Sequence, residues 1–473
     1  MAIPPNKSFD RTLVEGPILK AVWSLAWPTM LQNMIAGLQG IIDHTMVGHL
    51  VGYTANAAIG VSWQIFLVVV VFISSLYAGM GALAARFAGA GEPDKVNRVV
   101  YQALLTSIIM SLGILAPLGY FFSPQLLQLV HATPEVKAEA LPYLRTMFGF
   151  SLGMLIFFLL GGALRAAGDA RTPLRLGIAM TMLNMILNVI LIRGLGPIPA
   201  LGTFGSALGT VIASGIVAVF GIYSLFSPRA AVHFSKHMNW KPDWEIIRAL
   251  FRFGLPAGFQ GIAMNVAGVF LLRYIGSLPQ SAEAQAAFAV GYTELFSLIT
   301  WTSVGLMGAT AALAGQNLGA GKPERSKQAV HAAAMIGLGV AITIGMLFQL
   351  IPNSLLGLFG MENGMVVEIG VQLLRYLSIS GLFITCALVY TGGLQGTGDT
   401  RSPLYISLVS QIAIPLGFCA AKQAQGGLRP ADIWLAIIMG HAARCLLSMW
   451  KFRQGKWREI RMEVRSSEKL AVE

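Results

Sequence analysis

Asp43 is a carboxylate within an apolar stretch of sequence that runs from about residue 21 to residue 45. Gln32, Gln39 and Asp43 follow one another at spacings of seven and four residues, so on an α-helix their side chains lie within about 40° of one another. They form a narrow polar stripe on an otherwise apolar helix. Such a stripe indicates a helix face that meets other polar groups.

Two later apolar segments carry polar stripes of the same kind. Amide and hydroxyl side chains recur in them every three or four residues, which places them on one helix face. Together with the stripe of Asp43 they can line one polar site made of three helices. The members are Thr181, Asn184 and Asn188 in segment 174–192, and Ser206, Thr210 and Ser214 in segment 204–226.

A carboxylate surrounded by amide and hydroxyl groups has two chemical uses. Where water is scarce, it can take up and release a proton. Alternatively, the oxygen atoms of neighbouring side chains can complete a cage for a sodium ion around it, since hard cations prefer oxygen ligands. A third interpretation involves no ion: Asp43 lies near the outer end of its helix and simply caps it or meets water.

The elements that must position these residues are membrane-spanning helices. Of the 473 residues, 55% are hydrophobic and only 11% are charged, whereas a soluble domain carries about 25% charged residues. Twelve apolar segments approach or exceed the roughly 20 residues that an α-helix needs to cross a membrane. We therefore expect an all-α polytopic membrane protein. The segments are 21–45, 56–84, 99–122, 141–164, 174–192, 204–226, 250–276, 285–314, 329–351, 371–395, 403–420 and 431–450.

The net charge of +12 indicates membrane orientation and not a nucleic-acid partner. With an even number of helices both termini lie on one side, and all but seven of the 33 basic residues fall there, including the tail from Arg444 onward. Basic residues concentrate on the cytoplasmic side of membrane proteins. We expect both termini to be cytoplasmic, and the first segment, too long for a signal peptide, to be retained. The seven exceptions are Lys137, Arg145, Arg193, Arg273, Arg375, Lys422 and Arg429.

An internal repeat relates the two halves of the chain. Residues 82–93 (ALAARFAGAGEP) recur as 312–323 (ALAGQNLGAGKP), and 164–174 (LRAAGDARTPL) recur as 394–404 (LQGTGDTRSPL), both at an offset of 230 residues. Earlier in each half, at an offset of 228, Pro28 and Gly48 match Pro256 and Gly276.

The repeat predicts two parallel lobes of six helices, because six helices return the chain to its starting side. We expect an N-terminal lobe at 1–228, a cytoplasmic linker at 229–241, and a C-terminal lobe at 242–473 that ends in a basic cytoplasmic tail. Transporters built from such repeats place their substrate between the halves and alternate its access.

The repeated loops predict turns and helix starts. In GAGEP and GAGKP, glycine suits a left-handed backbone and proline begins the next helix. In GDARTP and GDTRSP, the aspartate is expected to bind neighbouring backbone amides. The stretch GQNLGAGKP is similar to a phosphate-binding loop, but Pro323 stands where serine or threonine is required and no strand precedes it. Nucleotide binding is therefore not expected.

These loops, together with IIDHTMVGHL around Asp43, resemble the multidrug and toxic compound extrusion (MATE) family, closest to its DNA-damage-inducible bacterial and archaeal branch. The resemblance covers nearly the whole chain. It implies a secondary active antiporter of the bacterial inner membrane that exports amphipathic, often cationic compounds against inward flow of protons or sodium ions.

The resemblance also implies roles for individual residues. Asp43 matches the family's first-helix acid, Asn184 its fifth-helix asparagine and Thr210 its sixth-helix threonine, so these residues are expected to bind the coupling ion. Asn188 stands where archaeal members have a second aspartate. This departure leaves the site with a single negative charge, which favours protons, although a sodium ion at Asp43 remains the alternative.

The coupling site is expected in one lobe only. At the offset of 228 residues the counterpart of Asp43 is Leu271. Met264 and Ile384 occupy positions where another branch of the family has acids. The second lobe therefore has no equivalent carboxylate at these three positions.

Four residues are candidates for lining a substrate cavity, and Glu294 is the acidic one among them. It lies inside the segment 285–314, and its repeat partner is Gln64. Glu294 either attracts a cationic substrate or balances Arg273. The other candidates are Gln32, Gln39 and Gln64.

Two other classes of function fit the sequence less well. A lipid-linked oligosaccharide flippase of the same wider superfamily needs cations in its cavity, but Arg and Lys are almost absent from the expected helix interiors. An intramembrane enzyme needs paired catalytic groups, but the seven histidines are scattered and only His44 adjoins another candidate. We expect a monomeric transporter in the lipid bilayer, without enzymatic activity, cofactor or resident metal.

The distribution of basic residues predicts which loops face the cytoplasm. Cysteines introduced into 229–241 and into the C-terminal tail should react with an impermeant thiol reagent only from the cytoplasmic side. A cysteine in place of Arg193, one of the seven exceptions, is the matched control and should react from the opposite side. Reaction of the linker or tail from outside would reverse the orientation.

Overall fold

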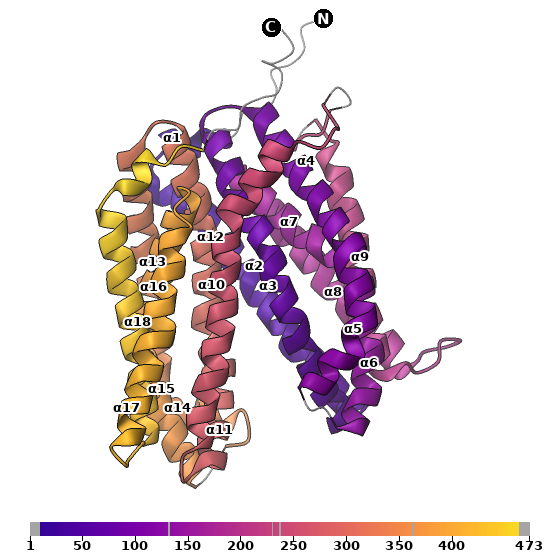
Figure 1. The fold of residues 1–473 in the computed structure, drawn as a ribbon, viewed down its shortest axis with the longest axis vertical. Coiled ribbons are helices and arrows are strands. Elements are labelled where there is room, and N and C mark those ends of the chain that lie inside the picture. The colour runs from indigo at the N-terminus through magenta and orange to yellow at the C-terminus, as the bar shows by residue number, and fades with distance from the viewer. Residues whose placement is uncertain (1–9, 131–132, 229, 236–237, 362–363, 463–473) are drawn as a thin grey trace, which may run out of the picture. The chain divides into compact units, whose positions relative to one another are not determined.

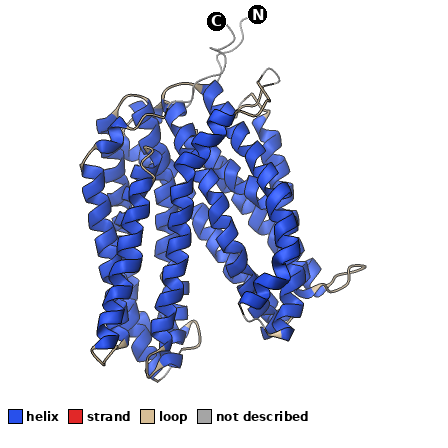
Figure 2. Cartoon of the chain, in the orientation of Figure 1, coloured by secondary structure: helices blue, strands red, loops and turns tan. Residues whose placement is uncertain are grey.

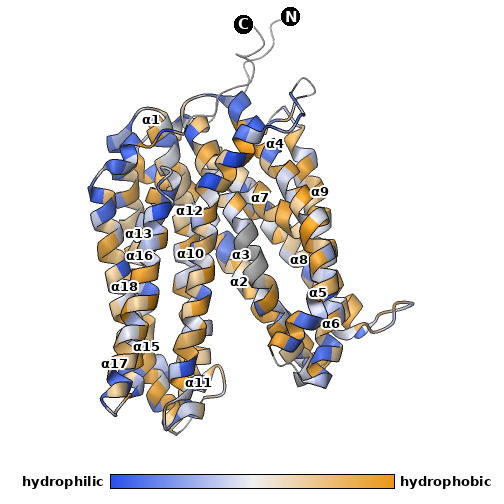
Figure 3. Cartoon of the chain, in the orientation of Figure 1, coloured by the Kyte–Doolittle hydropathy of each residue, from blue (hydrophilic) through white to orange (hydrophobic). Residues whose placement is uncertain are grey.

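The computed structural model describes residues 10–130, 133–228, 230–235, 238–361 and 364–462. These residues form helices and connecting loops, without a β-strand among them (Figures 1 and 2). The all-α fold expected from the sequence is confirmed. Apolar residues run along the helices, and hydrophilic residues gather toward helix ends (Figure 3).

Every one of the twelve apolar segments corresponds to a long helix or a run of consecutive helices. The first half contains α2 (Ile18–Leu50), α3 (Tyr53–Gly89), α4 (Pro93–Met110) continued by the π-helix η1 (Ser111–Leu115) and α5 (Ala116–Leu129), α6 (Pro134–Gly149) with α7 (Leu152–Ala166), α8 (Arg171–Arg193) and α9 (Gly202–Leu225). The second half contains α10 (Trp244–Gly276), α11 (Ser281–Phe288) continued by the π-helix η2 (Ala289–Leu295) and α12 (Ser297–Gly319), α13 (Pro323–Leu350), α15 (Met365–Gly396), α16 (Arg401–Ser407) continued by the π-helix η3 (Leu408–Ala413) and α17 (Ile414–Ala424), and α18 (Pro430–Arg453). Three short helices complete the described chain: α1 (Thr12–Glu15), α14 (Pro352–Gly357) and the 3₁₀ helix η4 (Lys456–Glu459).

Most of these helices can cross a membrane. Among the described residues, nine are long and apolar enough by themselves, and a tenth results if α6 and α7, which meet at 52°, form one broken span. The remaining two, α2 and α3, have 33 and 37 residues, more than the roughly 20 that a span requires.

The chain folds into two compact units. One consists of Ile35–Leu255 together with the described ends of the chain, up to Arg11 and from Met462, and the other of Thr12–Met34 and Pro256–Arg461. The division falls inside α2 and α10, so each of these helices belongs partly to both units. The boundaries expected from the repeat, at 228 and 242, stay a prediction; residues 229 and 236–237 of the linker and 463–473 of the tail lie outside the described residues.

The repeated GAGEP and GAGKP loops have the same backbone conformation in both halves. Gly91 and Gly321 have φ angles of 74° and 71°, in the left-handed region that favours glycine. Pro93 and Pro323 then begin α4 and α13. The turns predicted from the sequence are confirmed.

The aspartate of each GDxR loop binds the start of the next helix. Asp169 Oδ1 accepts hydrogen bonds from the backbone N–H of Arg171 and of Thr172, both at 3.0 Å. Asp399 Oδ1 accepts one from the backbone N–H of Ser402 at 3.0 Å. The hydroxyls of Thr172 and Ser402 donate to the second carboxylate oxygens at 2.6 and 2.7 Å. These acids satisfy amides that lack a partner within the helix, as the sequence predicted.

The unit that contains Pro256–Arg461 is built around α15, which packs against α12, α13 and α18. Glycines allow the closest approach: a Cβ atom at Gly392 would lie 2.3 Å from the backbone oxygen of Met307, and one at Gly396 would lie 2.0 Å from that of Ala311. Small residues at such contacts let membrane helices pack backbone against backbone.

In the other unit, the segment that precedes α10 is fixed to α4. Arg98 and Asp243 form a salt bridge of 2.7 Å, with side chains 16% and 8% exposed. Gln102 donates to the backbone oxygen of Lys241 at 2.8 Å and accepts from the backbone N–H of Asp243 at 3.1 Å. Because these groups are largely buried, the contact holds the start of α10 in a defined place.

Candidate functional site

The polar stripes of α2, α8 and α9 meet in one hydrogen-bonded cluster. Asn188 Nδ2, on α8, donates to Asp43 Oδ1, on α2, at 2.7 Å. Asn184 lies one helical turn before Asn188 and bonds to Thr210 of α9 at 3.1 Å. The first long helix and two consecutive later helices therefore contribute to the same polar site.

The Asn184 amide connects Asp43 to α9. With its amide rotated so that both ends are satisfied, Nδ2 donates to Asp43 Oδ1 at 3.0 Å, while Oδ1 accepts from the Thr210 backbone N–H at 3.2 Å and from its hydroxyl at 3.1 Å. In this orientation Asn184 and Asn188 both donate to the same carboxylate oxygen. Hydrogen bonds to a carboxylate are stronger than those between neutral groups.

A second contact joins α2 to α8 beside this cluster. The Thr181 hydroxyl donates to Gln39 Oε1 at 2.9 Å. The stripe of α9 contributes less than its spacing suggested, because the Ser214 hydroxyl donates to the backbone oxygen of Val211 at 3.1 Å, and Ser206 meets Thr210 only through its backbone oxygen.

The cluster is largely buried and leaves one acceptor unsatisfied. Asn184 and Asn188 are both 0% exposed, and Asp43 is half-buried. Asn188 Oδ1 is buried without a hydrogen-bond donor, a condition that costs about 1–3 kcal/mol. Within the described part of the chain, Asp43 forms no salt bridge. Its negative charge is therefore stabilised by amide donors alone.

Tyr143 is a neighbour of this site that sequence reasoning missed. It is 4% exposed on α6 and interacts electrostatically with Asp43. No spacing relates it to the three polar stripes, because α6 reaches Asp43 only through the tertiary fold. A buried tyrosine within an apolar segment was the sole signal, since its hydroxyl needs polar surroundings.

The other candidate residues lie outside the Asp43 cluster. Gln32 is half-buried on the part of α2 that belongs to the other unit. Gln64 is exposed on α3, and Glu294 is half-buried in η2. His44, beside Asp43 in sequence, bonds to Asn56 through Nδ1 at 2.6 Å.

The second half has apolar groups where the first half has its acid. Leu271, the counterpart of Asp43, packs against the core of its unit, and Ile384 is 3% exposed. One basic residue corrects the analysis of the sequence: Arg444, counted with the cytoplasmic tail, is 1% exposed inside α18. Its place in the cytoplasmic tail is therefore wrong, and Arg444 is a basic residue inside a helix, where Arg and Lys are otherwise expected to be almost absent.

Comparison with known proteins identifies relatives along almost the whole chain. The probable multidrug resistance protein NorM of Thermotoga maritima is 27% identical over 450 residues, which cover 93% of each chain. The multidrug export protein MepA of Staphylococcus aureus is 26% identical over 410 residues, or 85% of this chain and 87% of the relative.

Solved structures have the same fold. An outward-facing multidrug resistance MATE family transporter of the MOP superfamily matches with a TM-score of 0.86 at 21% identity, over 96% of this chain and 99% of that one. A MOP superfamily transporter from Pyrococcus furiosus matches with a TM-score of 0.87 at 21% identity and the same coverage. The MatE family model matches residues 28–190 and again residues 256–419, two stretches that begin at Pro28 and Pro256. Since these matches include well over half of the sequence and occur once in each half, the chain is a multi-pass membrane transporter that belongs to the MATE family.

Proposed function

We propose that this chain is a secondary active antiporter that exports amphipathic, often cationic compounds in exchange for inward flow of protons or sodium ions. The observation that carries the proposal is the Asp43 cluster, a carboxylate held by two amides between membrane helices. The names of its relatives, a multidrug resistance protein and a multidrug export protein, support this substrate class. It acts as a monomer in the bacterial inner membrane, with both termini in the cytoplasm.

Coupling follows from what an incoming ion changes at Asp43. The charged carboxylate accepts hydrogen bonds from Asn184 and Asn188. A proton or a sodium ion neutralises the carboxylate, so the two amides lose their charged acceptor and the contacts between α2 and α8 rearrange. A site that alternates between these two sets of contacts can link ion entry to a change of access.

We favour the proton as the coupling ion. Asp43 supplies a single negative charge, and both amides direct N–H groups at one of its oxygens. A sodium ion at that oxygen would need the amides rotated, so that oxygens face it. The unpaired Asn188 Oδ1 is the one amide oxygen available without rotation, whereas a proton binds to the carboxylate itself and needs no cage of further oxygen ligands.

The proposal requires that Asp43 and not its counterpart couples transport to the ion gradient. Asp43→Asn is expected to fold and insert but to lose uphill efflux of ethidium from proteoliposomes, because an amide can neither exchange a proton nor neutralise sodium. It keeps the size and the hydrogen bonding of the side chain, so a helix cap would tolerate it. Efflux is measured with pH and sodium gradients imposed separately.

Leu271→Asn, at the repeat-related position, is the matched control. It should retain coupled efflux at equal protein density, since Leu271 is a partly buried side chain that packs against the apolar core of its unit. Equal loss in both variants would contradict coupling through one lobe. Normal gradient-driven efflux by Asp43→Asn would show that Asp43 does not couple transport and is only a polar residue at a helix end.

Asn184→Ala distinguishes the two ions. If a sodium ion is bound by Asp43, Asn184, Asn188 and Thr210, this variant loses the sodium dependence of efflux. If Asp43 carries a proton, transport persists with its pH optimum displaced upward, because the carboxylate loses a donor that favours its charged form. Ser214→Ala is the control, since that hydroxyl bonds to its own helix. An unchanged optimum without sodium dependence would remove Asn184 from the site.

Gly209 tests whether the position of Asn188 matters. A Cβ atom at Gly209 would lie 2.2 Å from Asn188 Oδ1, so Gly209→Ala must displace the amide that donates to Asp43. We expect at least about a tenfold loss of coupled efflux, the effect of roughly 1.4 kcal/mol. Gly215→Ala on the same helix meets nothing within 4 Å and should transport normally. Full activity of Gly209→Ala would contradict a role for Asn188.

A further inference from the structure

Arg444 is a charged residue in the interior of one unit, without a carboxylate partner. Its side chain is 1% exposed, and it forms no salt bridge with any residue that the structure describes. It lies about 21 Å along α18 from Pro430 and about 13 Å from Arg453, at 1.5 Å per residue. A side chain this far from both ends cannot extend to water along its own helix.

The N–H groups of the Arg444 guanidinium are only partly hydrogen-bonded. Nη1 meets the sulfur of Met264 at 3.6 Å, a weak acceptor, and Nε has no hydrogen-bond partner. His441, one turn earlier, is occupied by a bond of 2.6 Å between its Nδ1 and the Ser380 hydroxyl. A buried cation with such poor partners is costly unless a counter-charge arrives from elsewhere.

Two further polar atoms on the same helix are buried without partners. They are Trp434 Nε1 and Ser448 Oγ, and their residues are 1% and 0% exposed. On a helical wheel Trp434, Arg444 and Ser448 lie within about 80° of one another. One face of α18 thus carries three unsatisfied polar groups, which is more than a packed apolar contact requires.

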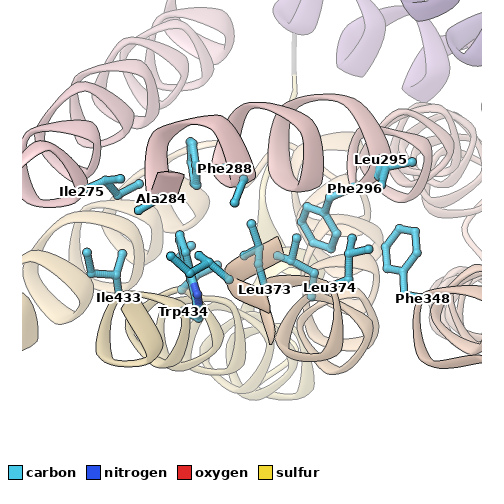
Figure 4. Packing of buried hydrophobic residues seen from close by; sticks show 14 of the residues in the cluster. Ile275, Ala284, Phe288, Leu295, Phe296, Phe348, Leu373, Leu374, Ile433 and Trp434 are labelled. Carbon is cyan, nitrogen blue, oxygen red and sulfur yellow. The ribbon is translucent and has the colours of Figure 1, made fainter. Parts of the chain in front are cut away.

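A column of aromatic rings runs beside this face. Phe288 stacks on Trp434 and on Tyr292, with ring centroids 6.1 and 4.7 Å apart and planes inclined by 9° in both pairs. Phe296 follows Tyr292 at 5.3 Å and stacks on His441 at 6.0 Å. Figure 4 shows Phe288 and Phe296 facing the side of Trp434 and the core residues of α15. Tyr292 also interacts electrostatically with Arg444.

Two of the side chains that cover Arg444 are less buried than Arg444 itself. Met264 and Tyr292 are each half-buried, in contrast to Arg444, His441 and Phe296. Tyr292 belongs to η2, a π-helical segment, and such segments occur frequently at functional sites. Met264 has an unbranched, adaptable side chain that can take other rotamers. Displacement of these two side chains would admit a ligand to the guanidinium.

We infer that Arg444 binds the carboxylate of an amphipathic aromatic compound, whose ring packs against the aromatic column. A single guanidinium matches a single negative charge, and its planar edge pairs with a carboxylate through two parallel hydrogen bonds. A spherical anion such as chloride would use neither the second donor nor the rings. The inference rests on the proposed efflux function and extends its substrates from cations to carboxylates and zwitterions.

Binding is tested on the full chain purified in detergent, without any gradient. The probe is 1-naphthoate, and the neutral 1-naphthamide is its uncharged analogue. Buffers that contain chloride or gluconate are also compared, to test whether a simple anion binds at the site. Naphthoate at tenfold its Kd should raise the unfolding midpoint of the wild type by at least about 2 °C and quench tryptophan fluorescence. Naphthamide and chloride should do neither. Equal stabilisation by chloride would overturn the assignment to a carboxylate.

Three variants test whether the stabilisation by naphthoate depends on Arg444. Arg444→Met should abolish it, whereas Arg453→Met, which removes an exposed charge at the end of the same helix, should not. Met264→Glu places a carboxylate beside Nη1, so it should raise the midpoint without ligand and block naphthoate; this keeps the test decisive if Arg444→Met does not fold. A response to naphthoate that survives in both Arg444→Met and Met264→Glu would overturn the inference. Ethidium efflux by the wild type is measured in a separate assay. An absence of efflux there would contradict the proposed efflux function but would leave the naphthoate-binding result unaffected.

Discussion

The interior of a membrane offers no water to polar side chains, and each polar group placed there must find a partner in the protein or in a ligand. Many hydroxyl side chains in the described helices meet that condition locally. The hydroxyls of Thr106, Ser107 and Thr310, for example, donate to backbone oxygens one turn earlier. Asp43 and Arg444 cannot be satisfied in this way because they are charged. Their charges must instead be stabilised by side chains of other helices or by a ligand.

The two halves stabilise their buried charges differently, although their sequences are related by the repeat. The loops that end and begin helices are the same in both, down to the glycine angles at Gly91 and Gly321 and the carboxylate bonds of Asp169 and Asp399. Two interior charges without a salt bridge among the described residues, Asp43 and Arg444, have opposite signs. One half holds an acid among amide donors, whereas the other holds a guanidinium among aromatic rings. The two halves therefore share the geometry of their loops but differ in the charged groups that they bury.

Features that depend on neighbouring residues could be predicted from the sequence. The apolar segments, the turns at GAGEP and GAGKP and the aspartate caps are local, and each was found where it was expected. The faces of Asp43, Asn184, Asn188 and Thr210 followed from helical spacing, and the choice of these four as a set followed from the family resemblance. Their hydrogen bonds bring them together, and their role in ion coupling stays a prediction.

Contacts between distant helices could not be predicted in the same way. Tyr143, on α6, lies close enough to Asp43 to interact electrostatically with it, and no pattern within α6 reports that proximity. Arg444 stands close to the basic tail in sequence, and a count of charges cannot separate a buried residue from the exposed ones that follow it. The detail of the site, such as two amides on one carboxylate oxygen, requires coordinates because it depends on side-chain rotamers.

The π-helical segment η2 lies in a helix whose length differs between the two halves. Its helix runs from Ser281 to Gly319 and has 39 residues, whereas the repeat-related α3 has 37. A residue inserted into an α-helix rotates everything beyond it by about 100° unless a wider turn absorbs it. The π-helical turn η2 accommodates more residues per turn than an α-helix, and the GAGKP loop that follows has the same geometry as GAGEP. Tyr292, which interacts with Arg444, lies in this wider turn, so the two halves keep the same frame while their interiors differ.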